Sequence, residues 1–354
     1  MNSGAMKYDR DYMHSLEEYD NHHLVTFLHD DTTGMEAYVA IHRMNGSTPS
    51  FGATRLWKYA SDTDALRDAL RLSRGMSYKA ALAGLPCGGA KGVIIDNGGS
   101  HKRILEVYAA NIAMLKNGFV TGTDVGVRQQ DLVFMKKRAP NIIGFNDNST
   151  EFTSIGIYHA IRCALRATFS DDSVKDRTFS IQGVGKIGSA MVELLAPEAK
   201  SISISDIDSG ALKRAVKRHP NITVVPPERI HRQKVDVFCP CAMGNAINTG
   251  NVAELNCAIV AGGANNQLEN EQVGDILHKM NILYAPDFVV NAGGLIAVYD
   301  EYEHTAYDKS RVRNKVAMIT KRLQDIIEES RSERVATHRI ANAKAERIFN
   351  SYAS

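Results

Sequence analysis

The first part of the chain contains two kinds of hydrophobic pattern, one typical of strands and one of helices. Two short apolar runs, at 24–27 and 37–41, flank the polar residues 30–34, and this arrangement predicts a β-hairpin. Apolar residues then recur at helical spacing in three stretches, 63–78, 105–115 and 131–138. Ser61 or Asp62 is the expected N-cap of the first helix. These elements together predict a mixed α/β domain.

The pattern changes further along the chain, where short apolar strands alternate with helical stretches. A polar, turn-rich segment at 141–154 is predicted to be a hinge, and a helix is expected at 155–169. Strands are then predicted at 179–181, 202–204, 235–238, 258–261 and 282–284. A charged helical stretch, 309–348, ends the chain. Strands that alternate with helices predict a doubly wound parallel sheet.

Length and composition restrict the possible classes of protein. A chain of 354 residues is too long for one ordinary core, so two domains are expected. The net charge of +2 gives no electrostatic case for nucleic-acid binding. With no apolar run of about 18 residues and a polar N-terminus, we expect no membrane span, no signal peptide and a cytoplasmic protein. Residues 1–5, ahead of the second methionine, are either native or an added tail.

The cysteines give no metal-binding pattern. There are five of them, and Cys239 and Cys241 form a C-x-C rather than the C-x-x-C of zinc and redox sites. Buried thiols in a reducing compartment are the favoured interpretation. We therefore expect no metal.

Residues 183–188, Gly-Val-Gly-Lys-Ile-Gly, match the G-x-G-x-x-G motif. The motif alone is weak, but here it follows a predicted strand and opens a helix, as a dinucleotide site requires. Gly183 would form the tight turn, Gly185 would admit the pyrophosphate, and Gly188 would let helix and strand pack closely. A glycine turn without a ligand is the alternative.

The acidic residue after the next strand distinguishes NAD from NADP. Asp206, 18 residues after Gly188, would accept hydrogen bonds from the adenosine ribose hydroxyls. Its carboxylate would repel the 2′-phosphate of NADP, so NAD is favoured. Asp208 is the alternative for this role.

Lys91 lies in a glycine-rich segment at 87–92, directly before an apolar strand. Glycines there indicate that another molecule approaches the backbone closely or that φ is positive. Lys79 comes 12 residues earlier, and Asp124 lies in the later segment 121–126 among small residues. A P-loop is excluded because Gly92 replaces its Ser/Thr, whereas a surface lysine in a glycine turn stays possible. The three charges suggest a site that holds an anionic substrate while a proton moves.

Two lysines beside one substrate can divide the chemical work. A free lysine is a poor base at neutral pH, but burial or a second ammonium group disfavours the charged form. One lysine can then anchor a carboxylate while the other acts as a base. A carboxylate such as Asp124 can exchange a proton with a reacting amine.

These segments resemble the amino acid dehydrogenases for glutamate, leucine, phenylalanine and valine, above all the leucine and phenylalanine members. The matching segments occur in family order, at 51–55, 76–79, 88–91, 121–126, 183–188, 240–242, 263–268 and 285–294. The resemblance implies that an L-amino acid, NAD⁺ and water give a 2-oxo acid, ammonium and NADH. It implies that Lys79 binds the substrate α-carboxylate, Lys91 activates the attacking water and Asp124 handles the amino-group proton.

The resemblance also implies the cofactor residues and the assembly. The expected NAD contacts are Gly183, Val184, Gly185, Lys186, Ile187, Gly188, Asp206, Ile207, Cys241, Ala242, Thr153, Asn265 and Asn291, the last two also facing the substrate. The family arrangement gives an N-terminal substrate and oligomerisation domain, 1–145, completed by a C-terminal helix, 325–354. The NAD-binding Rossmann-type domain is 146–324, with the active site in the cleft between the domains. A homo-oligomer, with a lean to a homodimer, is expected.

The substrate pocket is expected to be uncharged. By match to the family, its residues are Phe51, Gly52, Met76, Gly122 and Leu295, which predicts an apolar substrate side chain. Gly122 with Leu295 resembles the phenylalanine-type pairing and predicts room for an aromatic ring, so L-tryptophan or L-phenylalanine is expected. A leucine or valine dehydrogenase is the alternative, and a non-catalytic NAD-binding sensor is a remote one.

Overall fold

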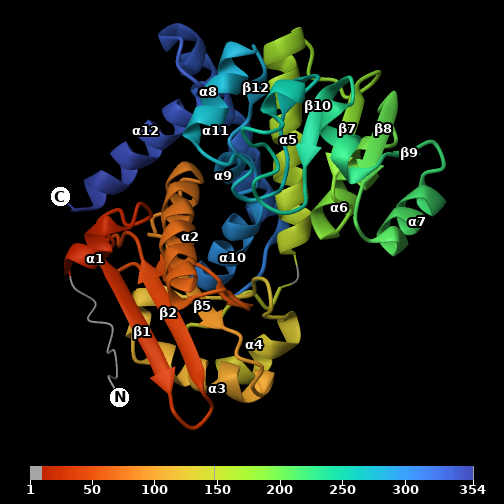
Figure 1. Ribbon diagram of the computed structural model, residues 1–354. Helices are drawn as coiled ribbons and strands as arrows, with labels where there is room; N and C mark the ends of the chain where they lie inside the picture. The colour runs from red at the N-terminus through yellow and green to blue at the C-terminus, as the bar shows by residue number, and fades with distance from the viewer. Residues whose placement is uncertain (1–9, 147, 354) are drawn as a thin grey trace. The chain divides into compact units, whose positions relative to one another are not determined.

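The chain folds into two compact units. A computed structural model describes residues 10–146 and 148–353, so the five residues ahead of the second methionine lie outside the described part. The first unit extends to Phe145 and includes the chain again from Arg347 onward. The second unit comprises Asn146–Glu346 (Figure 1). Each unit has a sheet of its own.

A four-stranded mixed sheet forms the centre of the first unit (Figure 1). In spatial order its strands are β1 (Leu24–Asp30), β2 (Met35–Ile41), β5 (Ala90–Ile95) and β4 (Thr54–Trp57). The pair β1–β2 is antiparallel and confirms the predicted hairpin. The pair β2–β5 is also antiparallel, whereas β4 and β5 are parallel. Two short strands, β3 (Ser50–Phe51) and β6 (Phe119–Val120), form a separate parallel pair.

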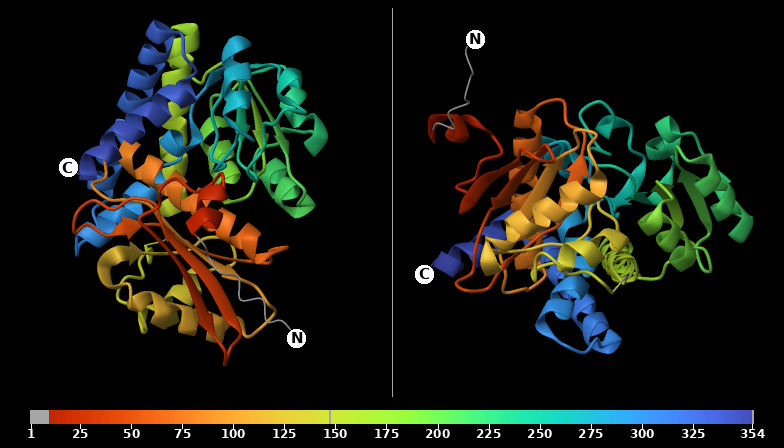
Figure 2. Two further views of the ribbon diagram at one scale, coloured as in Figure 1. Left: turned by 60° about the vertical axis from the view of Figure 1, so that its left-hand side comes forward. Right: turned by 90° about the horizontal axis from the view of Figure 1, so that it is seen from below.

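Helices cover both faces of this sheet (Figure 2). They are α2 (Asp62–Leu82) on one face, and α3 (His101–Ala113) and α4 (Gln129–Lys136) on the other, while α1 (Arg10–Ser15) precedes the sheet. Val39 packs with residues of α3 and α4, whereas its neighbours Tyr38 and Ala40 pack with α2, because successive strand residues point to opposite faces. The three predicted helices are thus confirmed. Ser61 is the N-cap of α2, accepting a hydrogen bond from the backbone N–H of Asp64 at 3.2 Å.

The second unit contains a six-stranded parallel sheet, as predicted (Figure 2). In spatial order its strands are β12 (Leu283–Tyr284), β11 (Cys257–Val260), β10 (Val235–Pro240), β7 (Thr178–Gln182), β8 (Ser201–Ser205) and β9 (Thr223–Val224). The helices between them include α6 (Lys186–Leu195), α7 (Ser209–Arg218) and α8 (Glu271–Lys279), and α9 (Asp287–Val290) follows the last strand, β12. The strand order reverses between β7 and β10, and ligands of doubly wound sheets bind at such a reversal, beyond the carboxyl ends of the strands.

The predicted hinge is shorter in the structure. Helix α5 (Ser149–Phe169) begins at Ser149, so the second half of the segment 141–154 is helical. The reason is packing, because Phe152 is fully buried and ties the first turn of α5 to the core. The predicted hinge is thereby shortened to the part of the segment before Ser149, the first of the two places where the chain passes between the units.

The charged C-terminal stretch forms two helices instead of one. Helix α11 (Lys309–Glu333) ends where Arg334 adopts a left-handed conformation with φ of 59°, and α12 (Thr337–Asn350) follows. The second unit keeps the chain to Glu346, so residues 325–346 lie in it and not in the first unit, where the sequence analysis placed them. Packing explains this difference, because α11 lies against α5, and Thr337 on α12 donates to the backbone carbonyl of Tyr284 at 2.6 Å.

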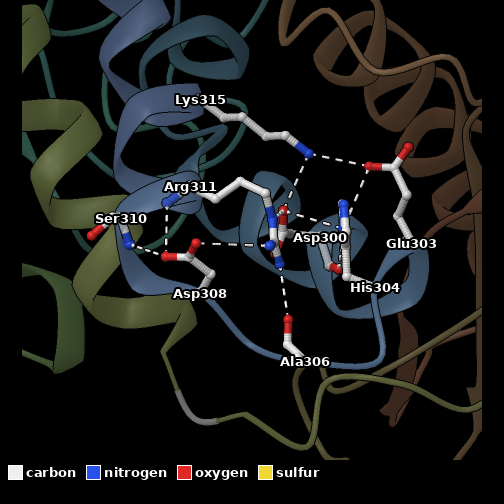
Figure 3. Close-up of polar contacts among 8 residues, drawn as sticks. All are labelled: Asp300, Glu303, His304, Ala306, Asp308, Ser310, Arg311 and Lys315. Atoms are coloured by element: carbon white, nitrogen blue, oxygen red, sulfur yellow. Dashed lines mark hydrogen bonds and ion pairs between the residues drawn. The ribbon is translucent and has the colours of Figure 1, made fainter.

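A buried carboxylate fixes helix α10 (Gly293–Glu303) to α11 (Figure 3). The side chain of Asp300 is 1% exposed and accepts two hydrogen bonds from Arg311, at 2.8 Å and 2.7 Å, and a third from Lys315 at 3.1 Å. Hydrogen bonds from Arg311, together with Lys315, outweigh burial and lower the pKa of Asp300. The carboxylate is therefore ionised at neutral pH and holds both cations on one side of α10.

Candidate active site

Lys91 and Asp124 form a partly buried ion pair in the first unit. Lys91 lies on the central strand β5, opposite Ala40 of β2, and its side chain is 6% exposed. Asp124 lies in the loop after β6, with a side chain that is 21% exposed. The Lys91 ammonium group donates a hydrogen bond to Oδ2 of Asp124. The strand therefore presents the lysine directly to the carboxylate that the sequence analysis paired with it.

The charges around Asp124 keep it ionised. Burial alone would raise its pKa, but the positive charges of Lys91 and Arg55 outweigh burial and lower the pKa below the usual aspartate value. Arg55 contributes a hydrogen bond from Nε to the same oxygen, Oδ2, at 3.2 Å. At neutral pH Asp124 is thus a proton acceptor.

The glycines around Lys91 are explained by the protein's own packing. A side chain at Gly89 would place its Cβ 2.0 Å from the backbone nitrogen of Ser77 on α2. At Gly88 it would meet the carbonyl oxygen of Arg43 at 1.7 Å, and at Gly92 the hydroxyl of Tyr108 at 1.9 Å. The sequence predicted the approach of another molecule at these glycines, whereas in the structure the space beside them is filled by neighbouring protein.

Lys79 is half-buried in the last turn of α2, the helix that packs on β5. Ser77 of the same turn accepts a hydrogen bond from the backbone N–H of Gly89 at 3.0 Å, which fixes the start of β5 to α2. Met76, one of the expected pocket residues, is half-buried in this turn. The two lysines therefore lie on elements that are joined directly.

Other expected pocket residues are tightly packed. Phe51 is 1% exposed, and a Cβ on Gly52 would lie 1.9 Å from the carbonyl oxygen of Ala90. A Cβ on Gly122 would lie 2.9 Å from the carbonyl oxygen of Ile143. Packing against Ile143 is thus a second reason for glycine at position 122, besides room for a substrate. Leu295, on α10 of the second unit, is 9% exposed.

The glycine motif of the second unit forms the turn between β7 and α6. Gly183 has a φ of 89°, and a side chain there would meet Ala242 at 2.8 Å, in the loop after β10. A Cβ on Gly188 would lie 1.8 Å from the carbonyl oxygen of Gly183, whereas Gly185 faces open space. The first and third glycines thus serve the turn and the packing, and Gly185 leaves the helix N-terminus accessible.

This N-terminus fits the pyrophosphate of a dinucleotide. Helix α6 begins at Lys186 with Gly185 as N-cap and no capping side chain, so its first amides keep their capacity to bind an anion. Lys186 and the neighbouring loop residue Ala242 are exposed, Cys241 and Ile187 are half-buried, and Val184 is buried.

The structure distinguishes the two acidic candidates. Asp206 follows β8, and its Oδ2 accepts a hydrogen bond from the backbone N–H of Val184 in the glycine loop at 2.7 Å. Asp208 instead caps α7, accepting from the N–H of Gly210 at 2.8 Å. Ile207 between them is 96% exposed, an apolar surface suited to a planar base. The position of Asp206 favours it for the ribose.

The second unit also contains the two asparagines and the threonine that were expected to contact NAD. Asn291 is 5% exposed and donates through Nδ2 to Oδ1 of the exposed Asn265 at 3.0 Å. The buried Oδ1 of Asn291 accepts no hydrogen bond from the described residues. A side chain at Gly294 would lie 2.8 Å from Oγ1 of the half-buried Thr153. An unsatisfied acceptor beside other polar groups fits the carboxamide of a nicotinamide ring.

Three residues around the Lys91–Asp124 pair escaped the sequence analysis. Arg55 stood in a matched segment without a role, and Tyr59 and Asp68 were not considered. The available signal was Asp68, which α2 buries one turn after the buried Ala65. A buried carboxylate usually has a charged partner.

No helix within the described residues, 10–146 and 148–353, combines the length and hydropathy needed to cross a membrane. These residues also contain no group of three or more His, Cys, Asp or Glu side chains arranged to hold a metal ion.

Two family models together match almost the whole chain. Residues 21–141 match the Glu/Leu/Phe/Val dehydrogenase dimerisation domain, and residues 144–350 match Glutamate/Leucine/Phenylalanine/Valine dehydrogenase. These two matches meet close to the division between the two units.

Individual relatives match over similar lengths. Leucine dehydrogenase from Bacillus subtilis (strain 168) is 34% identical, over 95% of this chain and 94% of that protein. Phenylalanine dehydrogenase from Thermoactinomyces intermedius is 35% identical, over 93% and 91%. L-tryptophan dehydrogenase from Nostoc punctiforme is 37% identical, over 93% and 94%, and its crystal structure matches with a TM-score of 0.80, over 94% of this chain and 97% of that one. The chain therefore belongs to the glutamate/leucine/phenylalanine/valine dehydrogenase family and is an amino acid dehydrogenase, an oxidoreductase of the leucine, phenylalanine, tryptophan or valine type.

Proposed function

We propose that this enzyme catalyses the reversible, NAD-dependent oxidative deamination of an aromatic L-amino acid, L-tryptophan or L-phenylalanine, to the 2-oxo acid and ammonium. The observation that carries the reaction is the partly buried ion pair between Lys91 and Asp124. A lysine and a carboxylate in direct contact can pass a proton between them and to a bound amine or water.

The proposed roles follow from the chemistry of each group. Lys79 binds the substrate α-carboxylate through its ammonium group. Asp124, ionised at neutral pH, takes a proton from the substrate ammonium group and leaves a neutral amine. Lys91, after releasing its proton to solvent, takes a proton from the water that attacks the imine carbon. Asp124 then returns its proton to the carbinolamine nitrogen, and the carbinolamine collapses to the 2-oxo acid and ammonia as its hydroxyl proton passes to solvent.

The residues of the second unit would hold the dinucleotide. The family comprises NAD(P)-dependent dehydrogenases, and the nicotinamide supplies the hydride acceptor for the substrate Cα. The α6 amides would bind the pyrophosphate, and Asn291 with Thr153 the carboxamide. Asp206 supports NAD over NADP, because a 2′-phosphate beside its carboxylate would be repelled.

The expected pocket residues support an apolar substrate side chain. Phe51, Gly52, Met76, Gly122 and Leu295 carry no charge that could pair with a glutamate side chain. The tryptophan and phenylalanine enzymes among the relatives support an aromatic ring. Leucine or valine is the second candidate, favoured by the similar identity to leucine dehydrogenase and by the packing reason for Gly122.

Initial rates with L-tryptophan, L-phenylalanine, L-leucine and L-valine test the proposal, with NADH formation followed by absorbance. We expect the highest kcat/KM for an aromatic substrate, and with NAD⁺ rather than NADP⁺. A higher value for leucine or valine would replace the aromatic assignment by the second candidate. No NADH from any of the four amino acids would contradict the proposed reaction.

We also infer that the enzyme is a homodimer formed through the first unit, since residues 21–141 match a dimerisation domain. Size-exclusion chromatography with light scattering should give twice the 38.9 kDa chain mass. A monomer or a larger assembly would exclude the dimer.

A further inference from the structure

Arg55 links Asp124 to a second buried carboxylate. It lies on β4, beside Val93 of β5, and its side chain is 23% exposed. Its Nε donates to Oδ2 of Asp124 at 3.2 Å, and its Nη1 donates to Oδ2 of Asp68 at 2.8 Å. One guanidinium group thus bridges the central sheet and helix α2.

Asp68 is itself held in place. It is 9% exposed, and its Oδ2 also accepts a hydrogen bond from the hydroxyl of Tyr59 at 2.6 Å. Its Oδ1 accepts from Arg71 at 2.9 Å on the outer side. Burial raises the pKa of Tyr59, so the phenol keeps its proton and stays a donor. Asp68 is therefore a fixed anion behind Arg55.

Asp124 has two cationic neighbours that differ in chemistry. Lys91 and Arg55 both donate to the same oxygen, Oδ2. An arginine keeps its proton under all conditions in which proteins work, whereas a lysine can release one. When Lys91 serves as a base, its positive charge disappears and Arg55 is the cation left on that oxygen.

We propose that Arg55, braced by Asp68 and Tyr59, is a positioning residue that orients Asp124 and keeps it ionised while Lys91 is neutral. The inference rests on the roles proposed above for Lys91 and Asp124. The planar guanidinium group suits this task because its nitrogens reach two carboxylates at once from a rigid fork. A lysine would supply the charge without the bridge.

The test compares the variants Arg55→Gln, Arg55→Lys and Arg71→Gln. Each variant is assayed in the oligomeric state that the wild-type enzyme forms. The measurements are kcat, KM for the amino acid and the pH profile of kcat/KM. Burial raises the pKa of Asp124, and the positive charge of Arg55 counteracts this effect. The pKa of Asp124 therefore rises when that charge is removed. We expect Arg55→Gln to move the acidic limb of the profile upward by about one pH unit or more. Its kcat should fall by roughly 10- to 100-fold, with a smaller change in KM.

The other two variants separate charge, geometry and simple packing. Arg55→Lys should restore the acidic limb while kcat stays reduced, because the charge returns without the bridge to Asp68. Arg71→Gln should keep both the profile and kcat, since Arg71 is an exposed side chain that donates to Oδ1 of Asp68 and not to the Oδ2 that accepts from Arg55 and Tyr59. Equal losses for the glutamine and lysine variants at every pH, with unshifted profiles, would overturn the inference.

Two additional variants keep the test decisive. If Arg55→Gln fails to fold, Tyr59→Phe removes one hydrogen bond from Asp68, and it should shift the acidic limb in the same direction by less. An unshifted acidic limb in the pH profile of Tyr59→Phe would then contradict the proposal that Asp68 and Tyr59 hold Arg55 in place. Asp124→Asn separates the two proposals: retained turnover would contradict the proposed function, whereas lost turnover with a normal Arg55→Gln profile would contradict only the role of Arg55.

Discussion

At the scale of single residues, the pair of lysines is expected to show a division of labour. Lys91→Ala should lower kcat by roughly 10²- to 10⁴-fold, the usual contribution of a general base, while NADH binding persists. Lys79→Ala should mainly raise KM for the amino acid, because it removes a carboxylate anchor and not the base. Steady-state kinetics with NADH binding by fluorescence checks both. Wild-type kcat in Lys91→Ala would remove the base role from Lys91.

Gly89 allows a second prediction, which concerns folding. Its missing side chain lets β5 approach the backbone of α2, where a Cβ would lie 2.0 Å from the nitrogen of Ser77. Backbone cannot move aside as a flexible side chain can, so Gly89→Ala should yield little folded enzyme or a much lower Tm. Gly75→Ala, on the solvent-accessible side of α2 with no atom within 4 Å, should be neutral or stabilise by about 1 kcal/mol. Thermal unfolding measures both, and equal effects would contradict the packing argument.

The residue scale also shows what the sequence can and cannot predict. Lys91, Asp124 and the glycine motif were identified because their neighbours along the chain are distinctive. Arg55 and Asp68 are 13 positions apart in sequence and meet only after β4 and α2 pack together. Their contact depends on tertiary structure, and no local pattern in one sequence encodes it.

At the scale of elements, helix α10 depends on the buried Asp300. Asp300→Asn removes the charge beneath Arg311 and Lys315 and should lower Tm by about 5 °C at neutral pH. Glu303→Gln is the matched control, since Glu303 pairs with Lys315 at 3.2 Å on the more exposed side, and surface pairs contribute little. Similar Tm values for Asp300→Asn and the wild type would contradict the proposal that Asp300 stabilises the packing of α10 against α11.

The stabilisation that Asp300 contributes depends on pH in a defined direction. The pKa of Asp300 is lower in the folded state than in the unfolded chain, so its stabilisation is present above the unfolded pKa. It is lost as the pH falls through the folded pKa. The Tm difference between wild type and Asp300→Asn should therefore stay constant from about pH 8 to about pH 5 and shrink below about pH 4.

The predicted element boundaries agree with the structure only where the local sequence signals are strong. Five of the six strands of the parallel sheet were predicted from apolar runs and are confirmed, whereas β9 was missed because its two residues, Thr223 and Val224, are exposed at the sheet edge. The break after α11 occurs at Arg334 in a left-handed conformation that glycine or asparagine usually takes. Without such a residue, the sequence reads as one helix.

At the scale of the whole molecule, the chain returns to its first unit at the C-terminus. Phe349 packs edge-on against His42 and Tyr78, with ring centroids 5.6 Å and 5.2 Å apart, and Arg43 lies over its face at 5.2 Å. Helix α12 thus begins in one unit and ends in the other, and the residues from Arg347 onward contribute to the first unit.

Because each unit has its own core, cofactor binding should stabilise them unequally. NADH would contact the loops at 183–188 and 206–207 and the asparagines near 265 and 291. At a free concentration of about 100 times its Kd, NADH adds about 2.7 kcal/mol to the free energy of any opening reaction that abolishes its binding. Hydrogen exchange followed by mass spectrometry should therefore show slower exchange in these peptides, and little change in the hairpin 24–41. Adding a non-reactive amino acid analogue should then slow exchange around Lys79 and Lys91. Equal protection of the hairpin by NADH alone would show that the two units open as one cooperative body, and would contradict their independence.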